Sequence, residues 1–249
     1  MAAVEVGYPD AERLVGIVYN EELAVPSCSY ILAETEKLLK FKSTNTSHQK
    51  WMKFLRMKSR PTGLPPVINS EADIRPWIQQ VSVKPALAVI RAAFQREEIQ
   101  IPEDIKARGP YTASSWGTQD MPIPDEILFS DVPTGDNFWG SQSTFAAALF
   151  EYKTMMAMKE SDVKKLVSYA KTYAELMVLP FIWPSSKTDC KLDSRSKIIA
   201  QVYCQLWRSN VDFMVLSSYQ LSLFLYLDRP SRILHISKPS FPGIPSNLS

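Results

Sequence analysis

The sequence predicts an α/β protein in which helices flank a small mixed β-sheet. Segments with helical spacing of apolar residues alternate with short apolar runs that are typical of strands. The 249 residues are 45% hydrophobic and 22% charged, which indicates a globular chain with a substantial buried core. We divide the chain into an N-terminal helical extension (1–62), an α/β domain (63–238) and a proline-rich tail (239–249).

The N-terminal extension predicts helices at 27–41 and 48–60, where apolar residues recur with charges between them. The second stretch is basic, and two interpretations stay open: a solvated helix face or a patch that contacts phosphate. Three prolines and a glycine within 60–66 cannot continue a helix, so the extension ends there.

The α/β domain begins with a predicted helix. Asn69 or Ser70 can cap it, and Glu71 and Asp73 in the first turn complement the helix dipole. Prolines inside the pattern predict a kink or a restart before the helix ends near residue 98.

Strands and two further helices follow. Short extended pieces are expected within 99–124, helices over 159–179 and 196–210, and strands over 126–132, 145–153, 211–220 and 221–229. The run at 145–153 is short and rich in alanine, so a helix is the alternative there. The order of elements indicates a mixed sheet.

Residue usage excludes several classes of site. No CxxC pair exists, which argues against a zinc site or a disulfide framework and suits a reducing compartment. The two histidines are far apart, so a histidine-rich metal site is excluded. No glycine-rich phosphate loop exists, which disfavours a kinase-like or nucleotide-binding protein.

Charge and hydropathy bear on location and partners. The net charge of +2 is too small to indicate a nucleic-acid binder by itself. The first residues are acidic where a secretory signal is basic, and no apolar run is long enough to span a membrane. We therefore expect an intracellular protein, cytoplasmic or nuclear, with no membrane partner.

The candidate site lies at the end of the 145–153 strand. Alternation would put Glu151 and Lys153 on one face and Tyr152 on the other. Pro124-Asp125 opens the preceding strand, so Asp125 and Glu151 would converge on adjacent strands. Together with the backbone carbonyl of Tyr152, these carboxylates suit Mg²⁺ or Mn²⁺, and Lys153 could assist water or stabilise charge on a phosphate.

Pro124-Asp125 followed by Glu151-Tyr152-Lys153 resembles the motif of the PD-(D/E)XK nuclease superfamily. The resemblance implies a restriction-endonuclease-like core: a helix, a three-stranded antiparallel meander, a helix and a further strand, which residues 70–228 can supply in that order. It also implies metal-dependent hydrolysis of nucleic acid, with DNA favoured over RNA.

Further roles follow from the resemblance. Asp125, Glu151 and Lys153 would be catalytic, and Glu71 would be an additional metal ligand. Lys197 or Gln201, on the helix after the motif strand, would be a supporting polar group.

Several alternatives stay open. Asp131 or Asp136 could replace Asp125 as the second acid. The chain could also be an inactive nuclease-like module that binds a partner through its aromatic residues. In that case it could be the leading part of a larger protein. The aromatic residues considered for that role are Trp183, Trp207, Phe224 and Tyr226. The oligomeric state is not predicted.

Overall fold

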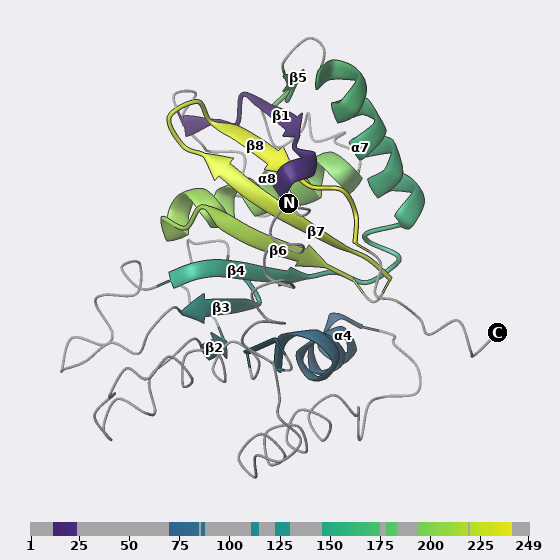
Figure 1. Ribbon diagram of the computed structural model, residues 1–249, viewed down its shortest axis with the longest axis vertical. Coiled ribbons are helices and arrows are strands. Elements are labelled where there is room, and N and C mark those ends of the chain that lie inside the picture. The colour runs from purple at the N-terminus through teal and green to yellow at the C-terminus, as the bar shows by residue number, and fades with distance from the viewer. Residues whose placement is uncertain are drawn as a thin grey trace, which may run out of the picture.

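The computed structural model describes residues 12–23, 70–84, 86–87, 111–114, 123–129, 146–174, 178–183, 194–218 and 220–240. Its strands are β1 (Gly16–Tyr19), β2 (Tyr111–Ser114), β3 (Glu126–Phe129), β4 (Ala146–Tyr152), β5 (Leu179–Pro180), β6 (Phe213–Ser217), β7 (Ser222–Asp228) and β8 (Ile233–Ile236). These described strands form one mixed sheet in the order β2-β3-β4-β6-β7-β8-β1-β5 (Figure 1). The predicted α/β fold with a mixed sheet flanked by helices is therefore confirmed.

Helix α4 (Glu71–Ile78) begins at Ser70, one of the two predicted caps. The Ser70 backbone N–H and hydroxyl both donate to Asp73 Oδ2, each at 3.0 Å. This closes the first turn in the manner of a capping box, with Asp73 in the acidic position. Pro76 lies inside α4, and the backbone continues directly into a π-helix, Gln79–Val83. The predicted interruption is thus a change of helix type just after the proline.

Strands β2, β3 and β4 form an antiparallel meander, and β4 then pairs in parallel with β6. Side chains of the meander alternate between two cores. Ile127 and Leu149 face the main core, whereas Leu128 and Phe150 pack with α4 residues. The strand predicted over 145–153 is confirmed as β4, and the helical alternative for it is wrong.

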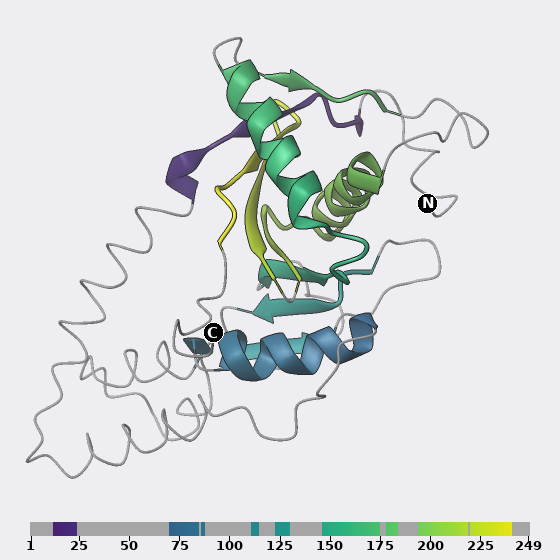
Figure 2. The same cartoon turned by 90° about the vertical axis from the view of Figure 1, so that its right-hand side faces the viewer.

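Helices α7 (Glu160–Ala174) and α8 (Ser194–Ser209) cover the main core, and both were predicted. Helix α7 runs beside β1, while α8 packs on β6 and β7 (Figure 2). Their apolar faces meet the inward leucines of the sheet. The buried helix residues of this core are Val163, Val167, Ala170, Ile199, Ala200, Val202, Tyr203, Cys204 and Leu206.

The assignment of 1–62 as a helical extension is wrong for Gly16–Tyr19. These residues form β1, which lies inside the sheet between β8 and β5 and runs parallel to β8. A Cβ on Gly16 would lie 2.2 Å from Val178 Cγ1 and 2.8 Å from the Leu179 carbonyl oxygen, so the approach of β5 requires glycine. The helices expected at 27–41 and 48–60 lie outside the described residues.

Strand β8 was also not predicted. It follows a tight turn after β7 and pairs with it antiparallel. Just beyond β8, Ser240 in the predicted tail makes an isolated bridge with Ser222 of β7, and 241–249 lie outside the described residues. None of the described helices is both long and apolar enough to cross a lipid bilayer.

The C-terminal end of α8 is held by Arg229. Its guanidinium donates to the carbonyl oxygens of Leu206 at 2.7 Å, Trp207 at 3.2 Å and Val211 at 3.0 Å. It also pairs with Asp212. One cation thus donates to two carbonyl groups in the last turn of the helix and to one carbonyl just beyond it.

Arg229→Met should therefore destabilise the fold. We expect the free energy of unfolding to fall by about 2–3 kcal/mol, because charge-assisted hydrogen bonds are lost at several carbonyls. Urea denaturation measures this. Lys238→Met, a change of an exposed cation, is the control and should shift stability by less than about 0.5 kcal/mol. Equal effects of the two substitutions would contradict the role given to Arg229.

Candidate active site

Strand β4 carries a buried ion pair at its C-terminal end. Glu151 is only 2% exposed and Lys153 is 8% exposed. The Lys153 ammonium donates to Glu151 Oε1, so both side chains lie on one side of the strand, as the alternation predicts. Tyr152 points the other way, into the small core beneath α4 with Ile74 and Ile78.

Asp125 lies beside this pair, one residue before the neighbouring strand β3 begins. The last paired residues of β3 and β4 are Glu126 and Phe150, so the ladder ends just before the site. Beyond it, the Tyr152 backbone N–H donates to Asp125 Oδ2 at 2.6 Å. The carboxylate of Asp125 takes the place of a strand carbonyl there. The alternative acids, Asp131 and Asp136, lie outside the described residues.

Helix α8 contributes two glutamines to the same carboxylate. Gln201 Nε2 donates to Glu151 Oε1 at 2.7 Å, and Gln205 Nε2 donates to Glu151 Oε2 at 2.8 Å. The sequence indicated Gln201 but not Gln205, although residues four apart share one face of a helix. Lys197, the other expected supporting residue, is exposed on α8.

Glu71 reaches the site from α4 by a different route. Its Oε1 lies 3.6 Å from Lys153 Nζ, and its side chain is about half exposed. Among the residues that the structure describes, no three His, Cys, Asp or Glu side chains form a group that could hold a metal ion. Among the described residues, Glu71 therefore contacts the lysine and does not complete a three-carboxylate ligand set with Asp125 and Glu151.

Burial and charge shift the acid and the lysine of the pair. Burial raises the pKa of Glu151; Lys153 opposes this shift, and the nearby charge of Asp125 adds to it. Burial alone would lower the pKa of Lys153, but the carboxylates of Glu151, Glu71 and Asp125 outweigh it and raise that pKa. Lys153 is therefore a cation at physiological pH.

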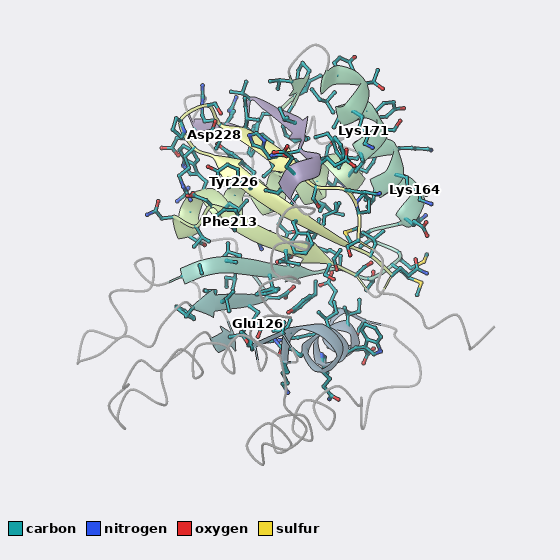
Figure 3. The ribbon with its side chains drawn as sticks, in the orientation of Figure 1. Glu126, Lys164, Lys171, Phe213, Tyr226 and Asp228 are labelled. Atoms are coloured by element: carbon teal, nitrogen blue, oxygen red, sulfur yellow. The ribbon has the colours of Figure 1, made fainter. Side chains whose placement is uncertain are left out.

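A second buried carboxylate, Glu126, lies on the other face of the motif. Tyr152 Oη donates to Glu126 Oε2 at 2.8 Å, and Figure 3 shows Glu126 at the end of β3 that approaches α4. Burial and the charge of Glu126 raise the pKa of Tyr152, so the hydroxyl stays protonated as a donor. Sequence reasoning missed Glu126, because an acid within an apolar strand carries no sign of its partner.

The oxygens around Asp125 and Glu151 fit a hard divalent cation. A carboxylate offers about four lone-pair sites, and Glu151 uses two on Oε1 and one on Oε2, so Oε2 keeps one site. Asp125 uses Oδ2 and can offer Oδ1. Among the described residues, buried Gln205 Oε1 has no hydrogen-bond partner and would suit a water bound to such a cation.

The raised pKa of Glu151 predicts a pH-dependent difference in stability between wild type and Glu151→Gln. The folded protein holds the Glu151 proton more tightly than the unfolded chain. Wild-type stability therefore decreases as pH rises above 4.5, the ordinary value, until folded Glu151 has ionised. Glutamine keeps an acceptor oxygen for Lys153 but does not titrate.

The free energy of unfolding of Glu151→Gln relative to wild type should thus increase over that range and then become constant. Urea denaturation of both proteins from about pH 4 to about pH 8 measures it, with circular dichroism to verify that both fold. Parallel stability curves would show that burial does not disfavour the ionised carboxylate.

Comparison with models of known protein families, with curated proteins and with solved structures found no match to this chain. The resemblance carried by Asp125, Glu151 and Lys153 therefore depends on the motif and on the arrangement of the elements that bear it.

Proposed function

We propose that this chain is a metal-dependent nuclease of the PD-(D/E)XK type, which hydrolyses phosphodiester bonds in nucleic acid with Mg²⁺ or Mn²⁺, with DNA as the expected substrate. One observation carries the proposal. The buried Glu151–Lys153 pair at the end of β4 lies next to Asp125, which immediately precedes the adjacent antiparallel strand β3. Two acids that can hold a divalent cation, together with a lysine that can stabilise negative charge, are groups that can support metal-dependent phosphodiester hydrolysis.

The order of elements supports the proposal. Helix α4, the meander β2-β3-β4, helix α8 and strand β6, parallel to β4, follow the order that the resemblance implies. Helix α7 and strand β5 lie between β4 and α8 in sequence, as an insertion. They pack with β1, on the part of the sheet away from the site.

Each group of the site would have a separate role. Glu151 Oε2, Asp125 Oδ1 and the carbonyl of Tyr152 would hold the cation. When bound, the cation would polarise the phosphate and lower the pKa of a water molecule. Lys153, kept charged by its carboxylate neighbours, would stabilise negative charge that develops on the phosphate rather than act as a base.

Substitution of either charged motif residue should abolish metal-dependent hydrolysis. We expect Glu151→Ala and Lys153→Met each to lower the rate by about 10²–10³-fold or more, because the first removes a ligand of the cation and the second removes a positive charge beside the reacting phosphate. A fluorescent DNA substrate with Mg²⁺ or Mn²⁺ measures the rate, and chelation should stop it.

The matched control is the exposed Glu160–Lys164 pair on α7, whose separation is 2.6 Å. Glu160→Ala and Lys164→Met should retain wild-type rates. Hydrolysis that persists in Glu151→Ala, with contaminating nuclease excluded, would remove the basis of the assignment.

Metal binding can be tested without any substrate. A cation that binds the folded state alone raises the midpoint of thermal unfolding with its concentration. We expect Mn²⁺ at low millimolar concentration to raise this midpoint in wild type and not in Asp125→Asn. An equal shift in both proteins would place the cation elsewhere.

A second candidate function is an inactive nuclease-like module that binds a partner. The observation that favours it is an aromatic row across β6, β7 and β8, where Phe213 lies 5.0 Å from Tyr226 between ring centroids (Figure 3). Phe213 is 49% exposed and Phe224 is also exposed, whereas Trp183 is buried in the core. Absence of both metal binding and hydrolysis would favour this second candidate.

A further inference from the structure

Gln205 contacts both segments that supply the acids. It lies on the buried face of α8 with no exposed surface. One hydrogen of its side-chain amide goes to Glu151 Oε2 at 2.8 Å, and the same nitrogen donates to the carbonyl oxygen of Ile123 at 3.0 Å. The amide therefore links the end of β4 to the segment that enters β3.

The segment Ile123–Asp125 precedes the β3 ladder, which begins at Glu126. Ladder hydrogen bonds therefore do not fix the backbone at Asp125. Within the described part of the chain, two contacts hold this segment: the Gln205 bond to the Ile123 carbonyl, and the Tyr152 N–H bond to the Asp125 side chain at Oδ2. Both contacts connect this segment to β4: Gln205 also binds Glu151 of that strand, and Tyr152 belongs to it.

We propose that Gln205 is a positioning residue that sets the separation of Asp125 and Glu151 so that both can reach one divalent cation. This inference rests on the proposed function. Gln205 acts through the two acids, because its amide nitrogen contacts one acid directly and the backbone two residues before the other.

The unpaired oxygen of Gln205 supports a role beyond packing. Its Oε1 is buried without a partner among the described residues, and such an atom is costly to bury. The neighbouring glutamine provides a comparison within the same helix. Gln201 donates to the same carboxylate at 2.7 Å, but its bond goes to Oε1, on the side of Lys153.

The test compares Gln205→Met with Gln201→Met in the full chain, with two readouts. The first is the dissociation constant for Mn²⁺ by calorimetry. Loss of an outer residue that orients metal ligands typically weakens binding by about 10–100-fold. We expect that loss for Gln205→Met and a change of about threefold or less for Gln201→Met. At saturating Mn²⁺, hydrolysis by Gln205→Met should recover, because the chemistry of the acids is intact.

The second readout is hydrogen exchange of the Tyr152 backbone amide, which reports its bond to Asp125. We expect exchange to become about tenfold faster in Gln205→Met and to stay unchanged in Gln201→Met. The asparagine side chain of Gln205→Asn is too short to reach both acceptors, so this variant should give the same result as Gln205→Met. It replaces Gln205→Met in the test if the methionine variant does not fold.

The outcomes separate the two proposals. Equal Mn²⁺ affinities for the two methionine variants, with Tyr152 exchange unchanged, would overturn the role of Gln205. Wild type that binds no Mn²⁺ would overturn the proposed function and the purpose given to Gln205. The exchange measurement would still decide whether Gln205 positions Asp125.

Discussion

The site depends on one constraint: a carboxylate that is removed from water needs hydrogen-bond donors or a positive charge from the protein. Glu151 lies in the interior, where an unpaired charge would cost several kcal/mol. Lys153 from its own strand, and Gln201 and Gln205 from α8, supply the donors. The contact between α8 and the sheet is therefore polar at the end of β4, next to a core that is largely aliphatic and aromatic among the described residues.

This constraint explains why both faces of β4 are polar near its end. On the α8 face the acid and the lysine satisfy each other. On the α4 face, Tyr152 and Glu126 do the same through a hydroxyl and a carboxylate. A strand with buried polar groups on both faces can occupy only one register, because a slip by one residue would exchange the partners and leave charges without them.

Sequence reasoning succeeds where the signal is local. Neighbouring residues alone predict the strand that ends near Glu151, the helix cap at Ser70, and helices α7 and α8. The structure contains all of these elements. It also brings Asp125, Glu151 and Lys153 together. Gln205 and Glu126 were missed because their importance comes from contacts across the sheet or with a helix, which a single sequence does not display.

Strands β1 and β8 were missed for a related reason. The four residues of β1 and the four of β8 hold few positions in which a pattern can appear, and β1 pairs only with strands that are distant in sequence. Propensity alone cannot indicate that Gly16 is needed for close approach to β5. That requirement is visible only once the two segments lie side by side.

The position of β1 has a consequence for how the protein is made. β1 precedes the other described strands in sequence, yet its parallel neighbour β8 is the last of them. During synthesis, β1 cannot pair with β8 until nearly all of the described residues have left the ribosome. Folding of this half of the sheet then depends on a slow, long-range closure, and the edge of β1 that β8 will cover is open to wrong pairing in the meantime.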